Sequence, residues 1–94
     1  MKKHDFAEYV RLTDRIHERD GMRHLNASAM TTRSGEQFLA IIVLDRKTFG
    51  DEPLTEIVRR LCGRSILKDL AVKSVDENKN VVEFVFKQKK GGAK

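Results

Sequence analysis

The side chains of this chain that could do chemistry are mainly the cationic ones. Lysine and arginine total 19 against 14 acidic residues, which gives a formal charge of +5. Guanidinium and ammonium groups form charge-assisted hydrogen bonds with phosphate oxygens, so a basic chain favours nucleic acid as a partner. We expect a phosphate-binding surface made of the basic residues that precede the second predicted helix, that lie in its C-terminal half or just after it, and that lead out of the last predicted strand: Arg46, Lys47, Arg59, Arg60, Arg64, Lys68, Lys87, Lys89 and Lys90.

The basic clusters also have a simpler explanation. The acidic residues are interspersed among the basic ones, so solvated helix faces and a charged tail would give the same pattern. The five phenylalanines and the single tyrosine fit core positions and are not interleaved with the clusters. Stacking of bases on aromatic rings is therefore weakly supported, and any binding is expected to be mostly electrostatic.

Residue types typical of catalytic and metal sites do not occur at useful spacings. His4, His17 and His24 lack the cysteine or carboxylate partners that would complete a tetrahedral metal set. Acidic pairs such as Asp51-Glu52 and Asp76-Glu77 fit a helix entry and a turn better than acid–base catalysis. No glycine-rich phosphate loop or nucleophile elbow is present. We expect no metal, no cofactor and no enzymatic activity.

The elements that must position the basic residues follow a helix–strand–strand order that occurs twice. The sequence FAEYVR at 6–11 opens the first half, and LTEIVR at 54–59 opens the second. The first helix is predicted over about 5–19, and the second begins after the Asp51-Glu52-Pro53 entry signal and ends at Gly63. Helical spacing predicts that the first helix buries a face made of Phe6, Tyr9, Val10, Thr13 and Ile16.

Each predicted helix is followed by two β-like runs around a turn. Strands are expected at about 23–33 and 38–44 in the first half, and at about 67–75 and 81–87 in the second. Two helix–hairpin units most simply build an α+β fold, an α-β-β-α-β-β pseudo-repeat. Its four-stranded antiparallel sheet would carry both helices on one face.

The face of this sheet opposite the helices is expected to be apolar. The run at 38–44 is apolar on both alternations, as in a strand covered on both faces. We expect Ala40, Ile42, Phe84 and Phe86 to face the helices. The remaining apolar residues, Leu39, Ile41, Val43, Val81 and Val85, would then form a patch too apolar to stay in water. A second copy of the chain or another protein partner should cover it, unless a helix does so.

The same surface supports an alternative function. The chain could be a protein–protein interaction module, such as an inhibitor, adaptor or assembly factor, that uses the apolar sheet face or a strand edge.

Length and composition limit the organisation of the chain. Its 94 residues predict one small α+β domain over 1–90, followed by a flexible basic tail at 91–94. The only cysteine, Cys62, is expected to be a buried small hydrophobe in a reducing compartment. No apolar run approaches 18 residues and no secretory signal is visible, so we expect a cytoplasmic location without membrane insertion.

Overall fold

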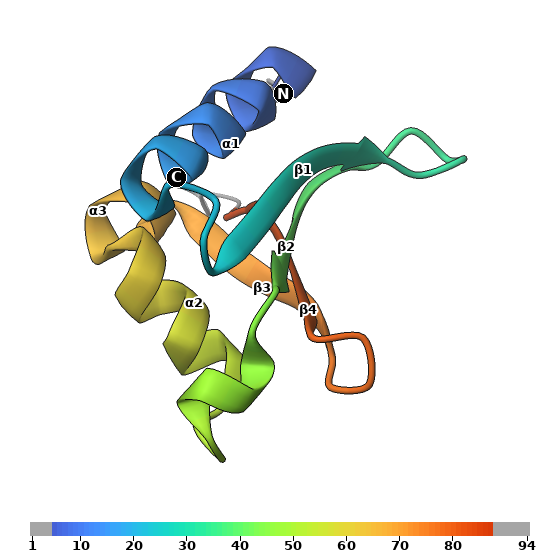
Figure 1. Ribbon diagram of the computed structural model, residues 1–94. Helices are drawn as coiled ribbons and strands as arrows, with labels where there is room; N and C mark the ends of the chain where they lie inside the picture. The colour runs from blue at the N-terminus through green and yellow to red at the C-terminus, as the bar shows by residue number, and fades with distance from the viewer. Residues whose placement is uncertain (1–4, 88–94) are drawn as a thin grey trace.

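Each half of the chain contributes one hairpin to a single four-stranded sheet and one main helix that packs on it (Figure 1). The computed structural model describes residues 5–87 and confirms the predicted α+β fold. Its elements are α1 (Phe6–Asp20), β1 (Leu25–Thr31), β2 (Gln37–Val43), the 3-10 helix η1 (Arg46–Phe49), α2 (Leu54–Cys62), α3 (Arg64–Leu67), β3 (Leu70–Asp76) and β4 (Val81–Phe86). The predicted flexible tail at 91–94 lies outside the described residues.

The two hairpins join through their second strands. The strand order is β1-β2-β4-β3 and every neighbouring pair is antiparallel. At the seam between β2 and β4, Leu39 lies opposite Phe84 and Ile41 opposite Val82. Figure 1 shows the helices on one side of this sheet, so the sheet has one helix-covered face and one helix-free face.

The core fills the layer between the helices and the sheet. It combines side chains from all three α-helices and all four strands: Tyr9, Leu12, Ile16, Leu25, Ala27, Leu39, Ile41, Val43, Leu54, Ile57, Val58, Cys62, Ile66, Leu67, Leu70, Val82 and Phe84. Cys62 is fully buried as expected, and burial raises the pKa of its thiol to about 12. The thiol therefore behaves as an apolar group rather than as a nucleophile.

One long-range contact fixes α1 to the last strand. The Tyr9 hydroxyl accepts a hydrogen bond from the Phe86 amide at 3.1 Å, and the two rings pack with centroids 4.7 Å apart. Burial of the ring raises the pKa of Tyr9, and the hydrogen bond from the Phe86 amide partly offsets this shift. The N-terminal half of the chain is thus anchored to its C-terminal strand.

The end of α1 is shaped to deliver the chain into β1. Gly21 adopts a left-handed conformation (φ 66°) and donates its amide to the His17 carbonyl at 2.6 Å, which ends the helix. The Asp20 carboxylate, only 6 % exposed, accepts hydrogen bonds from the His24 and Leu25 amides at 3.0 and 2.8 Å. A helix side chain thereby caps the first amides of the edge strand.

The structure corrects the predicted orientation of β2. Leu39 and Ile41 are 0 % exposed and Val43 is 1 % exposed, because all three face the helices. Ala40 and Ile42, which were expected in the core, lie on the helix-free face instead. A strand that is apolar on both alternations gives no period-2 signal to choose its inner face, so the prediction was wrong by one residue.

The buried face of α1 also differs from the prediction. Phe6 and Val10 are 39 % and 40 % exposed, whereas Leu12, absent from the predicted face, is buried beside Ile16. The apolar residues of this helix cover more than one stripe. Packing against β1 and α2 selects the stripe that continues through Ile16 to Asp20.

The helix-free face is partly polar near the edge strand β3. The β3–β4 register shifts between Val72 and Ser74, which is a β-bulge beside Lys73. The Lys73 ammonium lies 3.7 Å from a Glu83 carboxylate oxygen and 5.1 Å from the centre of the Phe38 ring. A bulge and an edge lysine are common devices that discourage uncontrolled strand pairing.

Candidate functional site

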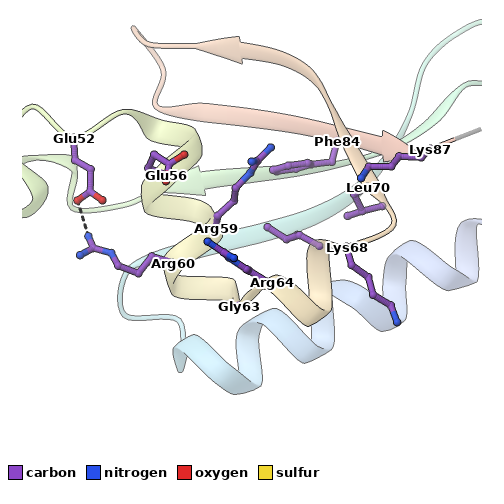
Figure 2. Close-up of a pocket in the computed structure, with 11 residues that line it drawn as sticks. Glu52, Glu56, Arg59, Arg60, Gly63, Arg64, Lys68, Leu70, Phe84 and Lys87 are labelled. Carbon is purple, nitrogen blue, oxygen red and sulfur yellow. Dashed lines mark hydrogen bonds and ion pairs between the residues drawn. The ribbon is translucent and has the colours of Figure 1, made fainter.

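Five of the nine predicted phosphate-binding residues line one groove. Arg59, Arg60, Arg64, Lys68 and Lys87 surround a cavity of about 700 Å³ between α2, α3 and the end of the sheet (Figure 2). Four of these residues lie within 59–68, across α2 and α3, and the fold adds Lys87 from the end of β4. We call this cavity the basic groove.

A break between two helices positions the central arginines. Gly63 ends α2 with φ 89°, and α3 begins at Arg64 in a new direction. Arg59 on α2 and Arg64 on α3 therefore both reach the groove. The break is braced from α1, because the Arg19 guanidinium donates through Nε to the Leu61 carbonyl at 3.1 Å.

The floor of the groove is apolar. Leu67, Leu70 and Phe84 line it, and Phe84 is only 1 % exposed. Lys87 follows β4 at the rim, where its amide donates to the Asp69 carbonyl at 2.9 Å. Charged side chains thus surround an apolar floor, and this floor offers no exposed aromatic ring on which a nucleobase could stack.

Acidic side chains limit the groove at one end. Glu52 and Glu56 also line the cavity, and a Glu52 carboxylate oxygen accepts a hydrogen bond from Arg60 at 2.6 Å. The Arg60 guanidinium also lies 5.7 Å from the centre of the Phe49 ring. Figure 2 shows Arg60 turned toward Glu52, on the side away from Lys87. Arg60 is therefore the cation of the groove that already has protein partners.

The other four cations have no recorded protein partner among residues 5–87. Within residues 5–87, the structure records no ion pair and no side-chain hydrogen bond for Arg59, Arg64, Lys68 or Lys87. All four are exposed, so holding them near one another costs little while water and counterions screen them. Phosphate oxygens at this position would replace those counterions.

The remaining predicted cations lie elsewhere. Arg46 and Lys47 sit on η1, and Arg46 donates to the Gly50 carbonyl at 2.6 Å, which closes its own loop. Neither residue lines the basic groove. Lys89 and Lys90 lie outside the described residues. The groove is therefore smaller than the predicted surface.

The predicted partner interface is divided between two places. Leu39, Ile41 and Val43 belong to the core and cannot contact a partner in this fold. Val81 and Val85 lie on the helix-free face and are half-buried, with Ile42 directly opposite Val81. An apolar helix-free face exists, but its β2 members are Ala40 and Ile42.

One polar pair was not predicted from the sequence. The His24 Nδ1 lies 2.5 Å from an Asp45 carboxylate oxygen, and the second oxygen of Asp45 is buried without a hydrogen-bond partner. The His24 ring also packs edge-on against Phe49 at 5.5 Å. The two residues are 21 positions apart and only the β1–β2 hairpin brings them together, so no local motif could have revealed them.

No group of three or more histidine, cysteine or acidic side chains within residues 5–87 is arranged to hold a metal ion. None of the helices there is long and apolar enough to cross a membrane. Comparison of the chain with protein-family models, curated proteins and solved structures gave no match.

Proposed function

We propose that this chain is a small, non-enzymatic, cytoplasmic nucleic-acid-binding or regulatory protein that binds the phosphate backbone through its arginine and lysine side chains. The observation that carries the proposal is the basic groove, where four cations without protein partners stand around one cavity. The buried floor of the groove and its exposed cations together favour a ligand that carries repeated negative charge and little apolar surface. A nucleic-acid backbone has that character.

The charge of the whole chain favours the same ligand. A formal charge of +5 draws polyanions toward the protein before contact, and the groove then fixes where they bind. Within the described part of the chain, no exposed aromatic ring lines the groove. The affinity is thus proposed to depend strongly on salt concentration and only weakly on nucleotide sequence.

The proposal is tested by fluorescence anisotropy of labelled DNA and RNA at several salt concentrations. The wild type should bind at low salt, with an affinity that falls steeply as salt rises. The triple substitution Arg59→Gln, Arg64→Gln and Lys68→Gln should weaken binding. It should also lower the slope of log affinity against log salt by about three, because each lost phosphate contact lowers it by about one.

A matched control separates the groove from general charge. Arg23, Arg33 and Lys79 are exposed, and none of them lines the groove. Their triple replacement with glutamine removes the same charge and should leave the slope nearly unchanged. Equal losses in the two triple variants would contradict the groove assignment, and failure of the wild type to bind any nucleic acid would refute the proposed function.

The helix-free face supports a second proposal, that two copies of the chain associate through it. Ile42 and Val81 face each other across the seam, and both remain partly accessible. Val85 continues this strip on β4 beyond Glu83, which lies on the same face opposite Ala40 and interrupts the apolar surface. A second copy offers an identical strip, and two-fold pairing is the commonest route by which a small domain covers such a face.

This second proposal is tested by sedimentation of Ile42→Asp. The variant should remain folded and become monomeric, while the wild type sediments as a dimer. A wild type that is monomeric at high concentration would refute self-association and leave the face available for another protein.

A further inference from the structure

The basic groove does not end at Lys68. A second cavity of about 400 Å³ begins there, lined by Arg11 and Arg15 of α1 and also by Lys68 and Leu70, which belong to both cavities. Figure 2 shows the Lys68 side chain pointing away from Arg59 and toward the side of the molecule where the helix α1 passes. Lys68 therefore stands between two groups of cations.

The cations of α1 form a row. Arg11, Arg15 and Arg19 are four residues apart, so they share one side of the helix. The last member is committed to the fold, because Arg19 donates to the Leu61 carbonyl. Within residues 5–87 the structure records no ion pair and no hydrogen bond for the guanidinium groups of Arg11 and Arg15.

The second cavity keeps a positive balance despite two acidic side chains. Glu8 and Asp69 line it together with the cations Arg11, Arg15 and Lys68. The cations outnumber the carboxylates, and the adjoining groove adds further positive charge. The potential over both cavities therefore still favours an anionic ligand.

Contact between α1 and α2 fixes the arginine row relative to the groove. Arg19 lies against Gly63, where an added β-carbon would approach the guanidinium carbon to 3.1 Å. The same glycine lines the basic groove. The position of Arg11 and Arg15 relative to the basic groove is therefore fixed, as a site for an extended ligand requires.

Building on the proposed function, we infer that the site is a continuous band from Arg11 and Arg15 across Lys68 to Arg59 and Arg64. Its ligand is the backbone of double-stranded nucleic acid. A mononucleotide or a single phosphate would occupy only one of the two cavities. A duplex presents an uninterrupted row of phosphates with the regular spacing that a fixed band can follow.

The choice of a duplex over a single strand follows from the aromatic residues. Proteins that grip single strands stack the bases on exposed rings. The rings that line the two cavities are Phe84, which is 1 % exposed, and Phe86, which packs against Tyr9. Phe84 is buried and Phe86 is half-buried against Tyr9, so the band offers charge to the backbone and no fully exposed ring on which unpaired bases could stack.

The experiment uses the full chain and a labelled duplex of about 16 base pairs. At ~3.4 Å per pair it is about 54 Å long, which exceeds the 43 Å longest dimension of the protein. The probe is compared with its own single strand in wild type and in Arg11→Gln/Arg15→Gln. The double variant should lower the duplex salt slope by about two, since each phosphate contact contributes ~0.9. The charge-matched Arg23→Gln/Arg33→Gln variant should leave that slope unchanged.

Each outcome has a defined meaning. Tighter binding of the duplex, together with the slope change confined to Arg11→Gln/Arg15→Gln, supports the inference. If the wild type binds nucleic acid but the α1 variant matches its control, or if the single strand binds as tightly, the extended duplex site is refuted and the proposed function survives. If the wild type binds neither probe, both are refuted. Circular dichroism of the variants tests whether they are folded, so that unfolding can be excluded as the cause of a lower slope of log affinity against log salt.

Discussion

The His17 imidazole covers the outer edge of β1, where its Nε2 accepts a hydrogen bond from the Ala27 amide at 3.0 Å. Two positions earlier along the strand, the Leu25 amide donates to Asp20 at 2.8 Å. Successive outward amides of an edge strand are thus occupied by side chains of the preceding helix. An edge protected in this way is less open to pairing with another chain.

Removal of the Asp20 cap should destabilise the protein. In Asp20→Ala the buried Leu25 amide loses its charged acceptor, and we expect a loss of about 1.5–3 kcal/mol in the free energy of unfolding. Urea denaturation measures this loss. Asp20→Asn keeps an acceptor without the charge, so its free energy of unfolding should lie between those of the wild type and Asp20→Ala. Equal stability of all three proteins would contradict the role of this cap.

The His17 bond requires a neutral imidazole with an unprotonated Nε2. Long-range ¹H–¹⁵N spectra of the native protein should therefore show the tautomer that carries its proton on Nδ1. His17→Ala should lose about 1 kcal/mol of stability and should aggregate more readily on heating, because an edge amide becomes free. A proton found on Nε2 would exclude the bond.

Gly63 should tolerate a side chain less well than Gly35, which also has a positive φ. Gly63→Ala must adopt φ 89° and must also displace Arg19, whereas Gly35 has φ 92° with no atom within 4 Å of an added β-carbon. Both variants bear backbone strain of about 1–3 kcal/mol, and only Gly63→Ala also weakens the bond from Arg19 to Leu61. Thermal denaturation should show the greater loss for Gly63→Ala. A greater loss for Gly35→Ala would contradict this account.

Neighbouring isoleucines should respond differently to truncation. Ile41 is 0 % exposed beneath the helices, so Ile41→Ala should cost about 2–5 kcal/mol of unfolding free energy. Ile42 is half-buried on the helix-free face, and Ile42→Ala should cost less than half as much. Paired urea titrations measure both values, and a larger loss at Ile42 would reverse the assigned faces.

Alkaline pH should destabilise the fold through Cys62. The thiol ionises near 9.0 when exposed and its pKa rises to about 12 in the folded chain, so unfolding releases a proton between these values. The contribution to stability is complete below about pH 9 and is lost as the pH rises toward 12. Tyr9 acts in the same direction, because burial raises its pKa.

Comparison with Cys62→Ala isolates the contribution of the thiol. The variant should lose less stability than the wild type between about pH 9 and about pH 11, as measured by urea midpoints. In the native wild type, a thiol reagent at neutral pH should react only on unfolding. Rapid labelling of the folded chain would show that Cys62 is accessible.

The helix–hairpin order was predictable because each element carries its own local signal. The Asp51-Glu52-Pro53 entry and the Gly63 stop bracket α2, and turn residues separate the strands of each hairpin. Strand ends differ from the prediction: the third strand begins at Leu70 rather than near Leu67, because α3 extends to Leu67 and a turn at 68–69 follows it. A four-residue helix has too short a pattern to be read by periodicity.

The site was predictable in composition but not in arrangement. Clustering in the sequence identified Arg59, Arg60 and Arg64, which share neighbouring helices. The positions of Arg11 and Arg15 beside Lys68 depend on how α1 packs against α3, which no local pattern encodes. The four-residue spacing of the α1 arginines was the only sequence signal for this arrangement. It places them on one side of the helix but does not indicate which element packs beside that side.

The seam between β2 and β4 has a consequence for the order in which the chain assembles. Each hairpin pairs residues close in sequence, whereas the seam joins Leu39 to Phe84 across nearly half the chain. Loop-closure entropy therefore favours early hairpins and a late seam in folding. Amides at the seam should exchange with solvent only when the whole molecule opens, while those near the β1–β2 turn exchange through local fluctuations.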